Sequence, residues 1–377
     1  MIRPTHSAPS ARDLPLGSRS RRKLAALVRP IRSPLALPSA GPRALAAAAL
    51  LTVAFACERL PNEPPASPPG AIRGITFADW TATGYVAPAA ETSLARLAAT
   101  GADAVTLLVT WYQTTPRAST FTTEDPRTPR AAVVNATIAR ARGLGLAVTL
   151  KFHVDLQNGA WRGTIDPADP DPWFVAYTNA LAVWARTAEK AGVERMVVGS
   201  ELAGTLNQEA RWRRVIAAVR ASFSGELTYA ASWDTADRVP FWDALDVVGI
   251  DFYAPVARRR NPGRAELLAG WQPWLTRFRR LHRQTGLPVL LTEVGYRSVD
   301  GAGLHPYRFD TGGPADPGEQ ADLYWAALEA VAAEPWVRGL FWWNWLADGS
   351  GGPANLDFTP LGKDAEDVLR STWNPAR

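Results

Sequence analysis

Short apolar runs alternate with amphipathic stretches along the chain from Ala71 onward. Apolar runs rich in β-branched residues are typical of buried strands, and apolar residues spaced three or four apart are typical of helices. The expected strands are Ile72–Phe77, Ala104–Thr110, Ala147–His153, Arg195–Glu201, Leu227–Ser232, Val247–Tyr253, Pro288–Glu293 and Gly339–Trp345. The clearest helical stretches are Phe174–Lys190, Gln208–Ser222, Ala265–Thr285 and Gln320–Ala333.

This alternation of strand and helix predicts an α/β fold with parallel strands joined by crossover helices. Gly192, Gly225 and Gly286 follow helical stretches, where the chain must turn into the next strand. Eight such units over about 300 residues match the usual size of one TIM barrel. We therefore expect residues 71–377 to form a single (β/α)8 barrel.

The segment before the barrel has a different composition. Residues 1–43 are rich in Arg, Pro and Ser, and Ala44–Ala56 is an apolar run of the length expected for a signal-peptide core, too short to span a membrane. Cys57 follows this run and is the only cysteine, and its placement resembles the lipidation site of a bacterial lipoprotein. The alternative is an ordinary cleaved signal peptide.

We therefore expect residues 1–57 to be a leader and signal peptide and residues 58–70 to be a Pro-rich linker. The protein would then be exported, either anchored to a membrane through a lipid on Cys57 or free in the periplasm or the medium. No other contact with a membrane is expected.

The distribution of charge argues against nucleic acid as a partner. The formal net charge is +5, but residues 1–57 contain nine of the 41 Lys and Arg residues and one of the 36 acids. The remainder is slightly acidic, so it has no electrostatic footprint for a phosphate backbone. The 16 tryptophans point elsewhere, because flat amphipathic rings suit a groove that stacks on sugars.

Two glutamates stand at the ends of apolar strands. Glu201 ends the fourth expected strand and Glu293 ends the seventh. In a TIM barrel the carboxyl ends of the strands form the catalytic face, and the closed sheet lets two side chains there face each other. Opposed carboxylates are what glycosidic bond cleavage requires. The alternative is a pair of rim carboxylates bound to Arg side chains or helix ends.

Other residues near the strand ends are candidates for binding a sugar. Tyr253 ends the sixth strand and could donate a hydrogen bond to the nucleophile, or it could be a wall residue. Trp343 and Trp345 are two apart on the eighth strand, so both are expected on one face, as a sugar platform or as core. The candidates for polar contacts to sugar hydroxyls are His153, Asp155 and Trp161. Weaker candidates for the same groove are Trp80, Trp111, Trp233 and Asp234.

The sequence indicates no metal and no organic cofactor. Its four histidines lack the spacing of metal ligands. There is no G-x-S-x-G elbow and no phosphate-binding loop, and Gly143-Leu-Gly145 precedes a strand instead of following one, so it is not a dinucleotide motif.

Several segments, taken in order, resemble glycoside hydrolase family 113. They are L-K-F-H-V-D, W-R-G-T-I, V-V-G-S-E-L, L-T-Y-A-A-S-W, F-W-D-A-L-D-V-V-G-I-D-F-Y-A-P, L-L-T-E-V-G-Y-R-S and F-T-P-L-G-K. The resemblance covers nearly all of residues 71–377 and implies membership of a clan of retaining barrel enzymes. It implies that Glu201 is the acid/base, that Glu293 is the nucleophile, and that the substrate is a β-1,4-mannan or manno-oligosaccharide.

Two other functions remain open at this point. One is a β-glycanase or β-glycosidase of the same clan that acts on glucan, xylan or galactan. The other is a surface lipoprotein that binds glycans without cleaving them, although a binding module would need neither glutamate. The fold alone does not decide between them.

Overall fold

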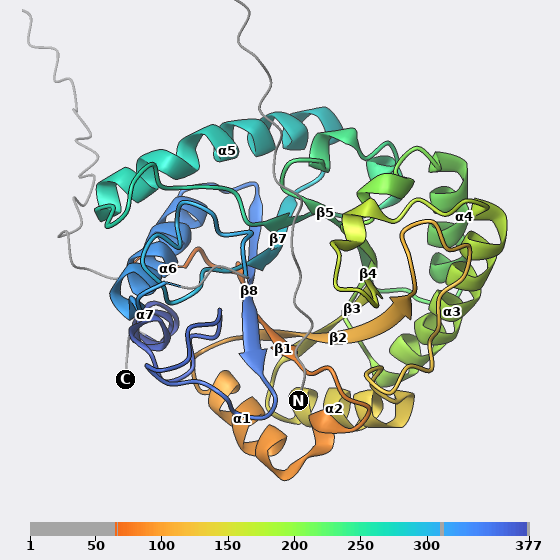
Figure 1. The fold of residues 1–377 in the computed structure, drawn as a ribbon, viewed down its shortest axis with the longest axis horizontal. Helices are drawn as coiled ribbons and strands as arrows, with labels where there is room; N and C mark the ends of the chain where they lie inside the picture. Colours follow the sequence, from red (N-terminus) through yellow and green to blue (C-terminus); the bar gives the residue numbers. More distant parts are fainter. Residues whose placement is uncertain (1–64, 66, 310–312, 375–377) are drawn as a thin grey trace, which may run out of the picture. The chain divides into compact units, whose positions relative to one another are not determined.

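Eight parallel strands close into a barrel in the computed structural model, which describes residues 65, 67–309 and 313–374. Each strand pairs with the next in sequence, and the eighth pairs with the first, so the predicted (β/α)8 barrel is confirmed (Figure 1). The strands are β1 (Ile72–Ala78), β2 (Ala104–Gln113), β3 (Ala147–Leu156), β4 (Arg195–Ser200), β5 (Glu226–Ser232), β6 (Val248–Phe252), β7 (Val289–Val294) and β8 (Val337–Leu346).

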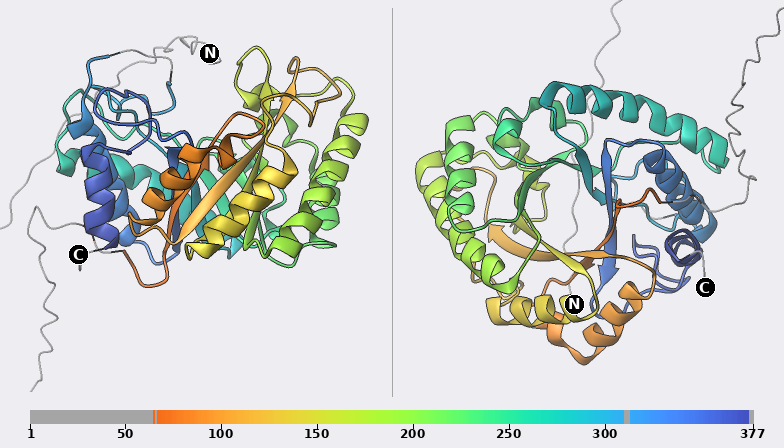
Figure 2. Two further views of the ribbon diagram at one scale, coloured as in Figure 1. Left: turned by 90° about the horizontal axis from the view of Figure 1, so that it is seen from below. Right: turned by 180° about the vertical axis from the view of Figure 1, so that it is seen from behind.

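The α-helices surround the barrel on its outside (Figures 1 and 2). They are α1 (Pro88–Ala98), α2 (Ala131–Gly143), α3 (Pro170–Ala191), α4 (Glu209–Arg220), α5 (Arg264–Thr285), α6 (Pro317–Ala332) and α7 (Asp364–Trp373). Between β5 and β6 the described chain has two 3₁₀ turns, Ala236–Arg238 and Trp242–Ala244, in place of an α-helix. Pro240 stands between the turns, where it would break a helix.

Aromatic side chains fill the space between the strands and the helices. Trp173 and Tyr177 of α3 stack with ring centroids 4.8 Å apart, and Trp111 of β2 packs edge-on against Tyr177 at 5.6 Å. Trp111 is 1% exposed. The prediction that Trp111 lies in a sugar-binding groove is therefore wrong, because its side chain points outward from the barrel into this layer.

An apolar layer closes the inside of the barrel toward its amino end. Its members come from four strands or strand edges and are Ala104, Val247, Leu290 and Phe341. Gly74 makes room for the Phe341 ring, since a Cβ at Gly74 would lie 2.2 Å from that ring. The inside of the barrel is therefore packed with side chains and is not a pore.

The two-residue periodicity of strands shows which side chains continue this inner face toward the carboxyl ends of the strands. Ala147 of β3 packs against the apolar layer, so Lys151, His153 and Asp155 face the barrel interior as well. The same counting from Val247 places Asp251 on the inner face of β6. Charged residues on two separate strands therefore point toward one axis.

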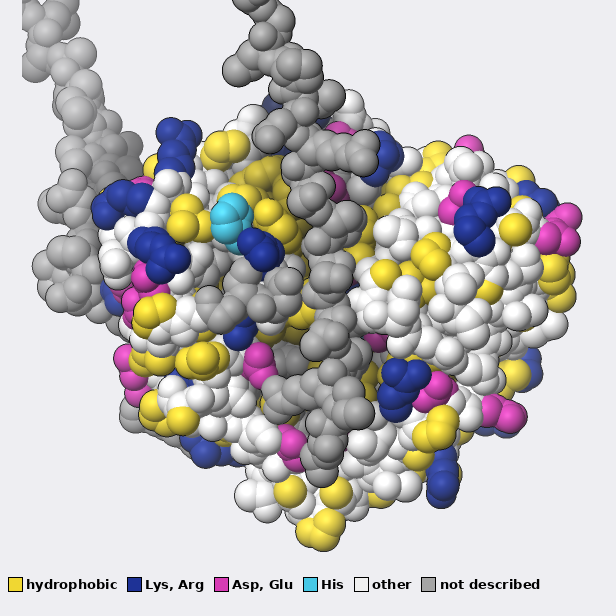
Figure 3. All heavy atoms as spheres, in the orientation of Figure 1, with side chains coloured by type: hydrophobic (Ala, Val, Ile, Leu, Met, Phe, Trp, Pro, Cys, Tyr) yellow, Lys and Arg dark blue, Asp and Glu magenta, His cyan; other side chains and the backbone are white. Residues whose placement is uncertain are grey.

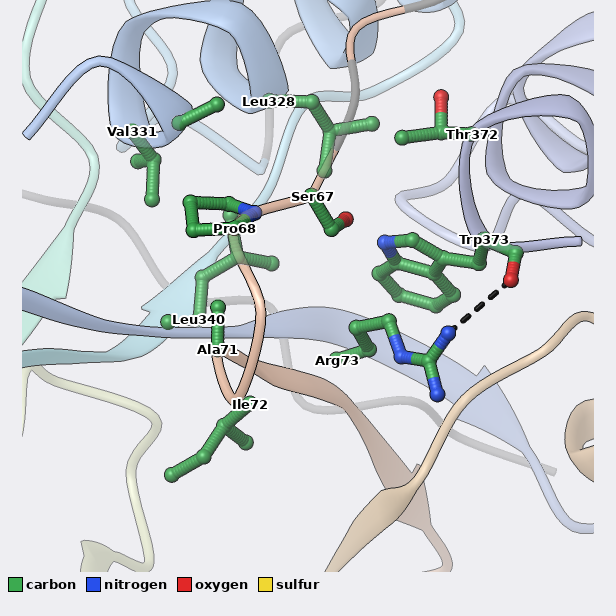
Figure 4. Close-up of a pocket in the computed structure, with 12 residues that line it drawn as sticks. Ser67, Pro68, Ala71, Ile72, Arg73, Leu328, Val331, Leu340, Thr372 and Trp373 are labelled. Carbon is green, nitrogen blue, oxygen red and sulfur yellow. Dashed lines mark hydrogen bonds between the residues drawn. The ribbon is translucent and has the colours of Figure 1, made fainter. Parts of the chain in front are cut away.

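At the amino end of β1, the chain that leads into the barrel packs against α6 and α7. Figure 4 shows Ser67 and Pro68 beside Trp373, with an apolar hollow between them. Arg73 is held there by Asp103, through a 2.9 Å ion pair, and by the carbonyl of Trp373, to which it donates at 3.0 Å. Arg73 is the charged side chain that lines this hollow, and it is already paired. We therefore interpret the hollow as a feature of packing and not as a binding site.

The predictions for residues 1–57, including Cys57 as a lipidation site, and for most of the linker lie outside the described residues. Within the part of the chain that is described, no helix combines the length and the apolar character needed to cross a membrane.

Replacing Trp111 by Ala is expected to lower the free energy of unfolding by about 3–5 kcal/mol, because it empties a fully buried site between sheet and helix. Trp161→Ala is the control, since Trp161 is 38% exposed and should cost far less. Chemical denaturation of both variants measures the difference. Equal losses would contradict the assignment of Trp111 to the core.

Candidate active site

Glu293 lies on β7 and is 2% exposed, yet several groups surround its carboxylate. The Lys151 ammonium, on β3, donates to Oε1. The Tyr253 hydroxyl, directly after β6, donates to Oε2 at 2.6 Å. Both oxygens therefore have a hydrogen-bond donor, and this arrangement stabilises the ionised form.

Lys151 joins Glu293 to a second buried carboxylate. Its Nζ lies 2.7 Å from Asp251 Oδ1, and the same oxygen accepts a 2.7 Å hydrogen bond from Thr292 Oγ1. The side chains of Lys151, Asp251 and Glu293 are each at most 3% exposed. One buried cation thus contacts two acids from neighbouring strands.

His153 is a weaker neighbour of Glu293. Its Nε2 lies 3.5 Å from Glu293 Oε1, which is too long for a good hydrogen bond. Burial, followed by the charge of Arg162, lowers the pKa of His153 to about 4. The ring is therefore neutral near pH 7, and Lys151 is the cation that balances Glu293.

Glu201 follows the last residue of β4 and has a backbone φ of 53°. A residue with a Cβ rarely adopts this left-handed region, and such strain concentrates at functional sites. The Glu201 amide donates to the carbonyl of Ala230 at 2.7 Å, which anchors the turn to β5. The side chain is thereby directed by a turn instead of by the strand pleat.

The turn after β3 supplies the partners of Glu201. Arg162, in the 3₁₀ turn Arg162–Thr164, donates to Glu201 Oε2 at 3.1 Å, and its other nitrogens donate to Asp155 Oδ1 at 2.9 and 2.7 Å. The Trp161 indole lies 3.4 Å from the same Glu201 oxygen. Asp155 therefore contacts Arg162, and Trp161 offers an exposed ring beside the carboxylate.

The two glutamates have opposite pKa shifts. Burial is the main influence on Glu201 and raises its pKa. Arg162 lowers this pKa, the negative charge of Glu293 raises it further, and the net effect is a rise. Burial, the largest single cause, would raise the pKa of Glu293 too, but the charge and hydrogen bond of Lys151 together with the contact from His153 outweigh it and hold this pKa below its usual range. Glu201 therefore keeps a proton to a higher pH than Glu293, the order expected of an acid/base and a nucleophile.

Trp343 and Trp345 do not lie on one face of β8. Trp343 stacks over His153, with centroids 6.0 Å apart, and packs edge-on against Trp80 at 6.1 Å. Trp345 is fully buried and donates to Ser93 of α1 at 3.0 Å. Trp345 as a sugar platform is therefore wrong: three residues of β8 oppose two of β1 at this point, so the alternation slips by one.

Trp233 and Asp234 follow β5. The Trp233 ring packs edge-on against Trp274 of α5 at 5.0 Å, and Asp234 accepts a 2.8 Å hydrogen bond from Ser232. Among the described contacts, neither residue reaches Glu201 or Glu293. Among the candidate tryptophans, Trp161 lies beside Glu201, and Trp343 lies over His153 with Trp80 packed against it.

The loops that follow the strands rise from one end of the barrel (Figure 2, left), and both glutamates belong to that end. Figure 3 shows both acidic and basic side chains on the visible face of the molecule.

Away from the glutamates, one group of three carboxylates in the described part of the chain is close enough to hold a metal: Asp300, Asp316 and Glu319. Asp300 pairs with Arg260, Asp316 caps the first turn of α6 at 2.8 Å, and Glu319 accepts from the amides of Gly301 and Gly303. Each of the three acids therefore already has a structural partner.

Sequence analysis does not single out three residues of the site. Lys151 contacts Glu293, Arg162 contacts Glu201, and Asp251 reaches Glu293 through Lys151. The spacing of these residues indicates a shared inner face. Lys151, His153 and Asp155 are two residues apart on one apolar strand, and so are Asp251 and Tyr253 on another. Charges on the inner face of a barrel need partners across it.

A sequence profile of glycoside hydrolase family 113 matches residues 75–363. The chain belongs to glycoside hydrolase family 113. This assignment agrees with the resemblance found in the sequence and makes the protein a glycoside hydrolase. The pair of inward carboxylates is therefore the candidate catalytic pair of this enzyme.

Solved structures support the same assignment. A structure described as a complex of a family 113 β-1,4-mannanase is 30% identical, with a TM-score of 0.74, over 81% of this chain and 99% of that one. The family 113 β-mannanase from Alicyclobacillus acidocaldarius, in complex with ManMIm, is 28% identical with a TM-score of 0.75, over 81% and 98%. Fungal β-1,4-galactanases, at 17% identity and a TM-score of 0.52, share the fold alone. A comparison with curated proteins finds no match.

Replacing Arg162 by Met is expected to raise the pKa of Glu201, because the cation that opposes burial is removed. The basic limb of the kcat/KM profile of this glycoside hydrolase should then move up by about one pH unit. Arg117→Met is the matched control, since Arg117 is exposed and pairs with Asp166 at the end of the same loop. A basic limb that stays in place or moves down in Arg162→Met would contradict the assignment.

Proposed function

We propose that this family 113 enzyme hydrolyses β-1,4-mannosidic bonds in mannan or manno-oligosaccharides with retention of configuration. One observation carries the chemical part of the proposal. The buried Glu293 and the largely buried Glu201, at the same end of one barrel, have opposite pKa shifts, and the charge of Glu293 acts on Glu201. A proton donor beside an ionised carboxylate is the pair that double displacement needs.

In the first step, the Glu293 carboxylate attacks the anomeric carbon while Glu201 gives its proton to the leaving oxygen. The glycosidic C–O bond breaks and an ester bond forms between the sugar and Glu293. Glu293 loses its negative charge in this step and Glu201 gains one. Arg162, which donates to Glu201 Oε2, stabilises that new charge.

In the second step, Glu201 takes a proton from water, and the water oxygen attacks the anomeric carbon. The ester bond breaks, Glu293 recovers its carboxylate, and Glu201 recovers its proton. Lys151 and Tyr253 donate to the carboxylate that leaves, so they favour its release.

The choice of mannan rests on similarity. The solved structures described as family 113 β-mannanases are 28–31% identical to this chain and match almost their full length to it. Trp161, 38% exposed beside Glu201, and Trp343, half-buried over His153, offer ring faces for pyranose sugars. A polymeric substrate also suits the export expected from Ala44–Cys57.

The roles of the two glutamates are expected to appear in the products formed with azide. Glu293→Ala should lose turnover of an aryl β-mannoside and, with azide, yield the α-mannosyl azide, because azide replaces the missing nucleophile. Glu201→Ala with azide should yield the β-mannosyl azide, because azide attacks the ester on Glu293. NMR of the azide products distinguishes the anomers. The opposite pairing of variants and anomers, or undiminished turnover by Glu293→Ala, would overturn the assignment.

The wild-type enzyme is expected to release reducing ends from β-1,4-mannan and to cleave mannohexaose faster than the matched glucan, xylan and galactan oligosaccharides. Chromatography of the products over time measures both the preference and the bonds that are cleaved. Equal or faster cleavage of another β-glycan would replace mannan as the substrate and leave the double-displacement chemistry in place.

A further inference from the structure

The contacts of Lys151 distinguish it from an ordinary structural lysine. It lies on the inner face of β3, 100 residues from Asp251 and 142 from Glu293 in sequence, and its ammonium contacts both acids. Beneath it lies the apolar layer of Ala104, Val247, Leu290 and Phe341, which separates it from the amino end of the barrel. A buried ammonium is retained only with a compensating charge at every stage of the reaction.

The proposed reaction changes the charge around this ammonium. In the free enzyme, the ionised Glu293 balances Lys151. In the glycosyl-enzyme, Glu293 is a neutral ester, and Asp251 is the carboxylate that still contacts Lys151. Thr292 donates to the same Asp251 oxygen that Lys151 contacts, which holds this oxygen in place when Glu293 reacts.

We propose that Lys151 is a positioning residue shared by two carboxylates: it holds Glu293 ionised and oriented in the free enzyme, and Asp251 alone balances its charge while Glu293 is esterified. This inference rests on the proposed function, because it assigns an ester to Glu293. It extends that function to two residues that touch no sugar in the proposed steps.

The charge balance explains the protonation of Asp251. One ammonium faces two carboxylates in the free enzyme, so a negative charge is in excess; burial, and next the charge of Glu293, raise the pKa of Asp251 to about 8. Esterification removes the charge of Glu293, so the pKa of Asp251 then falls. A proton held by Asp251 is released to solvent in that step, and Asp251 recovers it when Glu293 is freed.

Other titratable and charged groups face Glu293 and belong to the same balance. Besides Lys151 and Asp251 they are His153 of β3, Arg162 of the turn after β3, Glu201 after β4 and Tyr253 after β6. His153 is neutral near pH 7, and Arg162 is paired with Asp155 and Glu201. Lys151 is therefore the group whose removal changes the ionisation of Glu293 most.

The experiment compares Lys151→Met and Asp251→Asn in the two chemical steps. The probe is 2,4-dinitrophenyl β-mannobioside, whose leaving group needs no proton, so a rapid burst of dinitrophenolate reports ester formation. Lys151→Met is expected to slow release of the ester, because the departing Glu293 carboxylate has lost its cation. The glycosyl-enzyme should accumulate and be visible by intact-mass spectrometry.

Asp251→Asn is expected to change the opposite step. Ester formation now leaves Lys151 without a carboxylate, so this step should slow by tenfold or more and the burst should disappear. Lys151→Met should also raise the acidic limb of kcat/KM by about one pH unit or more, because an unbalanced Glu293 has a higher pKa. In Lys151→Arg the acidic limb of kcat/KM should lie close to its wild-type pH, because the cation is kept.

Arg195→Met is the matched control for loss of a buried cation. Arg195 begins β4 at the other end of the barrel and pairs with Glu226 of β5. The Arg195→Met variant should have lower thermal stability, but its burst of dinitrophenolate and its acidic limb of kcat/KM should be those of the wild type. Asp251→Asn conserves shape and keeps the test informative if Lys151→Met does not fold.

The inference fails if Lys151→Met and Asp251→Asn slow both steps equally and leave the acidic limb at its wild-type pH, as loss of packing alone would do. The proposed function fails separately, if Glu293→Ala with azide gives no α-mannosyl azide. A wild-type acidic limb in Lys151→Met, together with azide rescue of Glu293→Ala, would overturn the role of Lys151 and leave the roles of the glutamates intact.

Discussion

The contact of one buried ammonium with two carboxylates is the interaction on which the candidate site depends. Lys151, Asp251 and Glu293 come from β3, β6 and β7, and they meet because the sheet closes on itself. An ionised group inside an apolar barrel is strongly unfavourable unless it is paired. The barrel therefore holds Glu293, the proposed nucleophile, through charge balance as well as through packing.

Glu201, the proposed acid/base, is held in a different way. Glu201 stands on a left-handed turn after β4, and its partners Arg162 and Trp161 come from the turn after β3. Burial dominates its pKa, and Arg162 limits the rise. Two glutamates with the same side chain thus acquire opposite proton affinities, because one lies beside a buried lysine and the other in a desolvated turn with a shared arginine.

The tryptophans divide between two tasks according to the face of the strand that carries them. Trp111 and Trp345 point outward and pack under helices, where they stabilise the barrel. Trp343 and Trp80 lie near His153, toward the catalytic end. Trp161 lies beside Glu201 on the turn after β3. Aromatic content alone therefore does not indicate a sugar groove, and the outward or inward direction of each ring decides its role.

The sequence by itself determined the barrel and the two glutamates. Alternating strand and helix patterns leave few topologies, and the barrel places any acid at a strand end on the catalytic face. Only the tertiary structure showed that Lys151 meets Asp251 and Glu293, because periodicity gives the face of each strand but not which residues meet across a closed sheet. It also separated Trp343 from Trp345, because an extra residue in β8 shifts the alternation, and nothing local in the sequence marks that shift.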